Sequence, residues 1–187
     1  MKLEDLYKLL ITDKPSENIK NNEKEIFELI PELKSCKGFD QNNKWHIYDV
    51  YEHILHVVDN VSNNIVIRLA ALFHDIGKPE SYTIDDEGIG HFYGHWVISQ
   101  NIFDKFAIKY NIDKNISYIV SNLIYYHDIS INKLNNDELK ELINKLGSDG
   151  IELLFELKRA DLLAQNQKYH YLLDEYDKEK TYVLSKI

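Results

Sequence analysis

The segment Ile65–Phe73 constrains the fold most, because it carries a single charge, Arg68, and leads directly into His74 and Asp75. A stretch this apolar is predicted to form a buried helix, so the His-Asp pair that ends it should also lie in the interior. A buried imidazole beside a buried carboxylate is costly unless both are satisfied, and a divalent cation can satisfy both. Taken alone, the pair is weak support for a metal site, because buried polar groups usually find ordinary hydrogen-bond partners.

Helical periodicity extends over most of the chain. The 187 residues include only seven glycines and three prolines, and the apolar residues between them recur at helical spacing. An acidic, glycine-ended turn at 85–88 lies between two β-prone runs and predicts one small hairpin within 81–92. The expected fold class is all-α, a helical bundle with one small β-hairpin. The predicted helices cover about 3–10, 19–29, 50–61, 65–73, 95–110, 114–127, 137–146, 151–161 and 169–184, with a connecting loop over 35–45.

Length, charge and cysteine content exclude several classes of protein. A chain of 187 residues suits one domain, and its net charge of −9 disfavours extended nucleic-acid binding. No apolar run reaches the roughly 20 residues that span a bilayer, and the N-terminal residues lack the apolar core of a signal peptide. We therefore expect a cytoplasmic protein that has no membrane partner. Cys36 is the only cysteine, so any metal ligands must be His, Asp or Glu.

Polar residues that can bind metals lie on the apolar faces of several predicted helices. His127 extends the stripe of Ile124, Asp161 extends that of Leu157, and His53 lies beside the stripe of its own helix. Each residue alone is more often an ordinary core histidine or a capping or salt-bridged aspartate. Together they are hard to satisfy pairwise, because an unpaired buried carboxylate is costly. The candidate metal ligands are His53, His74, Asp75, His95, His127 and Asp161.

Nitrogen and oxygen ligands without sulfur suit Mn, Fe, Co, Ni or Zn, and suit Mg if oxygen and water dominate. The expected cofactor is one or two divalent ions, with Asp75 as the natural bridge because a carboxylate has two oxygens. Lys78, one turn beyond the His-Asp pair, could reach a phosphoryl oxygen as a point charge. Its alternative role is that of a solvated lysine at a helix end.

The order of these residues resembles the HD superfamily of metal-dependent phosphohydrolases, and most closely the HD domain of bacterial tRNA nucleotidyltransferases (CCA-adding enzymes). The resemblance implies that His53, His74, Asp75 and Asp161 form the core metal shell, and that His95 and His127 complete a second site in binuclear members. We expect one HD domain over 1–187, with a motif-bearing core at about 33–167 and helices of 1–32 and 168–187 packed on it. The matching segments are Gln41 and His46, Tyr48–His53, Arg68–Pro79, Gly90–His95 and Arg159–Asp161.

Three further residues are candidates for substrate binding: His46, which fits the family pattern, and Arg68 and Arg159, which lie beside candidate ligands in the sequence. Arg68 could equally pair with an acid in the core. The chain shows no sign of the nucleotide-transferring head, so nucleotide addition is not expected. Trp96 stands where a glutamate often follows the matching histidine, which alters the expected substrate contacts near the hairpin.

The resemblance implies a phosphohydrolase that cleaves a phosphomonoester or phosphodiester of a nucleotide or nucleic-acid end, as a 2′,3′-cyclic phosphodiesterase, nucleotidase or phosphatase does. Asp75 and Lys78 would take the catalytic roles. One alternative is a catalytically silent HD module that binds a nucleotide or a protein partner, and another is a helical protein with a purely structural metal. Aromatic residues near His95 and His127 could stack on a base, although aromatic residues in helices usually fill the core.

Overall fold

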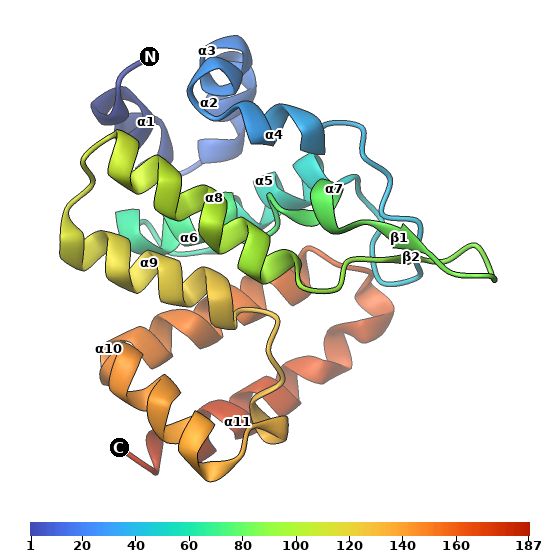
Figure 1. Cartoon of the computed structure of the whole chain (residues 1–187), viewed down its shortest axis with the longest axis vertical. Helices are drawn as coiled ribbons and strands as arrows, with labels where there is room; N and C mark the ends of the chain where they lie inside the picture. The colour runs from blue at the N-terminus through green and yellow to red at the C-terminus, as the bar shows by residue number, and fades with distance from the viewer.

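The computed structural model describes residues 1–187 and consists of helices with one short hairpin, as Figure 1 shows. This architecture confirms the all-α prediction. In chain order the elements are α1 (Leu3–Leu10), α2 (Pro15–Asn21), α3 (Glu23–Leu29), α4 (Pro31–Cys36), α5 (Val50–Asn60), α6 (Ile65–Phe73), α7 (Lys78–Ser81), β1 (Thr83–Ile84), β2 (Gly90–His91), α8 (His95–Lys109), α9 (Lys114–Tyr126), the 3₁₀ helix η1 (Ile131–Lys133), α10 (Asn136–Leu163), the 3₁₀ helix η2 (Gln167–Leu172) and α11 (Leu173–Leu184).

Helix α6 lies at the centre of the molecule, where it contacts α1, α5, α8, α9 and α10. Every residue from Ile67 to Phe73 is buried, which confirms the prediction made from its apolar sequence. The helix begins where the Asn64 side chain accepts a hydrogen bond from the Val66 amide at 2.8 Å. In Figure 1, α1–α4 lie above this centre, α10 and α11 lie below it, and the hairpin projects to one side.

Several other predicted elements are confirmed at their boundaries. The Asp49 side chain caps α5 by accepting a hydrogen bond from the Glu52 amide at 2.7 Å. The hairpin pairs Thr83 with His91 in antiparallel register. Gly147, with a φ of 61°, kinks α10 between the two helices predicted for this region.

Three boundary predictions were wrong. The helix predicted over 19–29 is two short helices that meet at Asn22, whose ψ of 25° leaves the helical range. Pro31 begins α4, part of which occupies the loop predicted over 35–45, because proline is well tolerated in a first helical turn. The helix predicted over 169–184 starts as the 3₁₀ helix η2 and becomes α-helical only at Leu173.

One cluster of 42 buried residues forms the core and includes residues from Leu6 to Val183. The cluster surrounds the helix ends that carry the candidate ligands, so those ends are held by packing on several sides. None of the helices combines the length and the apolar character that crossing a membrane requires.

Cys36 provides a test of this packing. Its side chain is fully buried, and burial together with the negative charge of Asp75 raises the pKa of the thiol. A raised pKa leaves little thiolate at pH 8, and the thiolate is the reactive form. We expect a disulfide reagent such as DTNB to label less than about a tenth of the native protein within minutes at pH 8. In denaturant, the same reagent should label all of the protein. Rapid labelling of the native protein would contradict the packing around α4.

Candidate metal centre

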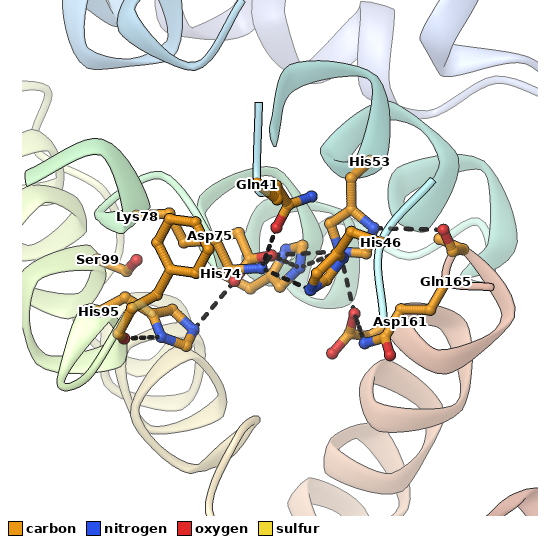
Figure 2. Close-up of polar contacts among 12 residues, drawn as sticks. Gln41, His46, His53, His74, Asp75, Lys78, His95, Ser99, Asp161 and Gln165 are labelled. Carbon is orange, nitrogen blue, oxygen red and sulfur yellow. Dashed lines mark hydrogen bonds and ion pairs between the residues drawn. The ribbon is translucent and has the colours of Figure 1, made fainter. Parts of the chain in front are cut away.

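The structure brings all six predicted metal ligands together from five helical segments. Figure 2 labels five of them: His53, His74, Asp75, His95 and Asp161. Their ligand atoms form two groups, and within each group all of these atoms lie within 4.8 Å of one another. The first group contains His53 of α5, His74 and Asp75 at the end of α6, and Asp161 of α10; the second contains Asp75 again, His95 at the start of α8 and His127 at the end of α9.

Asp75 belongs to both groups because its two carboxylate oxygens face different histidines. Its Oδ2 atom lies 3.2 Å from Nε2 of His53 and 3.2 Å from Nε2 of His74. Its Oδ1 atom lies 3.1 Å from Nε2 of His95 and 3.5 Å from Nε2 of His127. Asp161 completes the first group, with its Oδ1 atom 3.0 Å from Nε2 of His53. The carboxylate of Asp75 therefore has the geometry of a bridge between two cation sites.

The opposite nitrogen of each imidazole, Nδ1, faces a backbone carbonyl. A carbonyl can only accept a hydrogen bond, so Nδ1 carries the proton and Nε2 is left as the ligand atom. This carbonyl support of the non-ligating nitrogen is the arrangement that orients metal-binding histidines in proteins. The acceptors are the backbone oxygens of Ala71 for His74 (2.7 Å), Phe92 for His95 (2.9 Å), Ile124 for His127 (2.7 Å) and Ala164 for His53 (3.5 Å).

The four histidines are arranged as the ligands of a divalent cation would be. The Nε2 atoms of His95 and His127 lie 3.3 Å apart, and those of His53 and His74 lie 3.4 Å apart. Lone pairs that converge on one another and on a carboxylate repel unless a cation lies among them. Oδ2 of Asp75 is buried without a hydrogen-bond partner, although it lies 2.6 Å from the Lys78 ammonium.

The pKa of His53 also indicates that the carboxylates of this site favour a positive charge beside them. Burial alone would lower the pKa of His53, but its contacts with Asp161 and Asp75 outweigh burial and raise that pKa to about 9. Burial would raise the pKa of Asp75, whereas His74 and Lys78 lower it well below the usual range. The aspartate is thus held ionised, the state in which a carboxylate can bind a cation.

Two backbone features place His95 beside the His-Asp pair. Gly94, at a φ of 76°, is the residue from which α8 begins. Gly77 lies so close to α8 that a Cβ atom there would be 2.7 Å from the His95 carbonyl oxygen and 2.7 Å from the Ser99 amide nitrogen. The Gly77 amide also donates a hydrogen bond to the Ser99 hydroxyl at 2.9 Å.

Lys78 lies inside the site, and this position replaces the alternative of a solvated lysine at a helix end. Its side chain is only 6% exposed, and its Nζ atom lies 2.6 Å from Oδ2 of Asp75. The same ammonium donates a hydrogen bond to Oε1 of Gln41 at 2.8 Å. Gln41 in turn donates to the Tyr48 carbonyl oxygen at 3.2 Å, which fixes its orientation.

His46 lies beside the first group of ligands, as expected of a residue that contacts substrate or supports a ligand. Its ring contacts the edge of His53, with ring centroids 5.1 Å apart. Burial and then the positive charge of Lys78 lower the pKa of His46 to about 2. The imidazole is therefore neutral and would meet a substrate through hydrogen bonds alone.

The structure does not bring Arg68 and Arg159 to the site, and this placement corrects the expectation that they contact substrate. The Arg68 guanidinium is buried and donates to the carbonyl oxygens of Ser62 (2.9 Å) and Val58 (2.5 Å), at the end of α5. Arg159 points away from Asp161 and forms an ion pair with Asp177 of α11 at 3.1 Å. Adjacency in sequence was misleading because neighbouring residues of a helix face different directions.

A cavity of about 670 Å³ opens above both ligand groups. Its lining includes polar residues that sequence reasoning missed, among them Gln165 and Asp128. Gln165 donates to Oδ1 of Asp161 at 3.0 Å, and its spacing four residues after Asp161 was the available signal. The lining residues are Asn43, Lys44, Trp45, His46, Asp75, Lys78, Ile89, Gly90, His91, Phe92, Tyr93, His95, Trp96, His127, Asp128, Asp161 and Gln165.

Comparison with known proteins connects this geometry to a family. The model of the HD domain family matches residues 45–166, which include all six candidate ligands. A segment of 72 residues is 33% identical to a protein described as A-adding tRNA nucleotidyltransferase, from Deinococcus radiodurans. The match covers 35% of this chain and only 16% of that relative.

Proposed function

The chain belongs to the HD domain family, whose members are generally metal-dependent hydrolases, and on this basis we propose that it is a phosphohydrolase that cleaves a phosphate ester of a nucleotide or of a nucleic-acid end. The observation that carries the proposal is the arrangement around Asp75, where four imidazoles present Nε2 to the two oxygens of one buried carboxylate. This donor set suits one or two divalent ions of the Mn, Fe, Co, Ni and Zn series.

Divalent ions bound at such a site supply an acidified water as nucleophile and positive charge for the phosphoryl oxygens. The residues of the chain supply the remaining functions. Carbonyl partners hold the four histidines in the ligating tautomer, and Asp75 fixes the two ligand groups relative to each other. Lys78 brings a further positive charge to the cavity, next to Asp75, where it can contact a phosphoryl oxygen of the substrate.

Three observations are consistent with a nucleotide or nucleic-acid end as the substrate. The Deinococcus relative is described as acting on tRNA, although the chain spans only 16% of that protein. The cavity of about 670 Å³ is of a size that holds a small-molecule ligand, in the usual range of about 300–1,000 Å³. The net charge of −9 disfavours an extended nucleic acid and favours a short or terminal phosphate ester.

Metal analysis combined with a phosphoester screen tests this proposal. We expect the purified full chain, supplied with Mn, Co or Ni, to retain one or two ions after desalting and to hydrolyse an aryl phosphate monoester or diester. Asp75→Ala should abolish this turnover, and chelation should abolish it reversibly. Retained metal without turnover of any ester would instead favour the silent binding module. Chelation that unfolds the protein would favour a purely structural metal.

A further inference from the structure

Both tryptophans of the chain line the cavity above the metal centre. Trp45 comes from the loop before α5, and Trp96 is the second residue of α8. Phe73 and Phe103 are fully buried in the core, whereas Trp45 remains 38% exposed and Trp96 is half-buried. Aromatic surface left at the wall of a polar cavity is available to a ligand that brings its own planar ring.

Trp45 is a fixed wall of the cavity. Its indole packs against the Tyr169 ring of η2, with ring centroids 3.8 Å apart and planes inclined by 34°. Its carbonyl oxygen also accepts a hydrogen bond from the Asn166 amide at 2.9 Å. Because Tyr169 already supports the indole, little side-chain freedom remains to be lost when a ligand binds there.

Trp96 places a second indole directly beside the second group of metal ligands. Its ring lies edge-on to the His95 imidazole, with centroids 5.5 Å apart. Tyr93, which follows the hairpin, is 75% exposed and stacks on His91 at 5.2 Å with an interplanar angle of 8°. The cavity is therefore polar where Asp75 and the histidines lie, and aromatic along the walls that lead away from them.

We propose that the aromatic wall, defined as Trp45, Tyr93 and Trp96, binds the nucleobase of a mononucleotide whose phosphate lies at the metal centre. This inference rests on the proposed function and narrows its substrate class. Every nucleobase has a π-face that stacks on aromatic side chains with little dependence on sequence. The acidic Asp128 in the cavity lining and the net charge of −9 disfavour a longer, more highly charged strand.

Intrinsic fluorescence tests this inference without any turnover, because the chain has only two tryptophans and both line the cavity. The full chain would be titrated with AMP and with ribose 5-phosphate, which keeps the sugar and the phosphate but lacks the base. We expect AMP to quench the fluorescence in a saturable way and ribose 5-phosphate to bind at least about 10-fold more weakly. Equal affinity for the two probes would overturn the proposal, and this arm requires no variant.

Substitutions locate the base on the aromatic wall. Trp96→Leu should weaken AMP binding by about 5- to 150-fold, the range of one base–aromatic stack, and Trp96→Phe should recover most of that loss. Neither change should alter the binding of ribose 5-phosphate. Tyr118→Ala is the matched control, because Tyr118 is 51% exposed on α9 and does not line the cavity. Unchanged AMP binding in both Trp96→Leu and Trp45→Leu would overturn the assignment.

A hexaribonucleotide provides the final arm. Binding of this strand that is tighter than that of AMP and is lost in Trp96→Leu would overturn the limit to a mononucleotide. The outcomes also separate the inference from the proposed function. A protein that turns over no ester yet binds AMP through Trp96 would refute the hydrolase and keep the base site. Equal turnover of esters with and without a base would support the hydrolase and refute the base site.

Discussion

Asp75→Asn is expected to remove both cation sites at once and to lower phosphoester hydrolysis by at least about 10²- to 10³-fold. Each oxygen of Asp75 faces one pair of imidazoles, so a neutral amide at this position removes charge from both groups. An amide also presents a hydrogen-bond donor in place of one ligand oxygen. Metal content measured by plasma emission spectroscopy after desalting should fall from one or two ions per chain to less than a tenth of that value.

Two matched variants separate the sites. Asp161→Asn changes only the first group, whereas His127→Gln changes only the second. Each should cost one ion at most and leave the other group able to bind. If Asp75→Asn retained the metal content and affinity of the unaltered chain, Asp75 would not be the bridge and the proposed centre would be wrong. Circular dichroism of the variants separates loss of metal from loss of fold.

The sequence predicted the central helices well because their signals are local. The apolar run of α6 lies within nine consecutive residues, so its burial can be predicted without knowledge of distant segments. The break at Asn22 carries no comparable signal, because asparagine is only mildly unfavourable inside a helix and the chain around it remains amphipathic. The packing of α2 against both α1 and α5 must decide where that helix ends, and packing is not visible in one segment.

The inward position of the candidate metal ligands could be predicted for a related reason, since all of them except His95 extend, flank or end an apolar stripe. The cavity walls could be predicted only in part: aromatic residues near His95 were candidates for stacking on a base, but Trp45 was not. Trp45 lies in a loop whose path is set by distant segments, through contacts such as the hydrogen bond from the Asn166 amide to its carbonyl oxygen. The prediction for Arg68 was wrong because a buried guanidinium can equally well donate to the carbonyl oxygens at the end of a neighbouring helix, as it does at Val58.

Lys158 of α10 is a buried cation that pairs with no carboxylate, and sequence reasoning gave no sign of its role. It is 4% exposed, and its Nζ atom donates to the carbonyl oxygens of His127 (2.7 Å) and Ile129 (2.9 Å). Burial lowers its pKa. Helix α9 ends at Tyr126, and the last carbonyls of a helix have no partner within it. Lys158 therefore satisfies carbonyl oxygens just beyond α9, including that of the candidate metal ligand His127.

Lys158→Met keeps the unbranched apolar part of the side chain and removes both hydrogen bonds. It is expected to lower the free energy of unfolding by about 2–4 kcal/mol, because two buried carbonyls lose their donor. It should also weaken the second cation site, which contains His127, by about 10- to 100-fold, the usual effect of losing a residue that orients a ligand. The first site should be unaffected.

Denaturant unfolding in chelator measures the loss of stability, and metal titration measures the loss of affinity at the second site. Lys140→Met, on the same helix with a side chain 75% exposed, is the control and should change stability by less than about 0.5 kcal/mol. If Lys158→Met had the stability of the unaltered chain and the same metal affinity at the second site, the end of α9 would be held by packing alone.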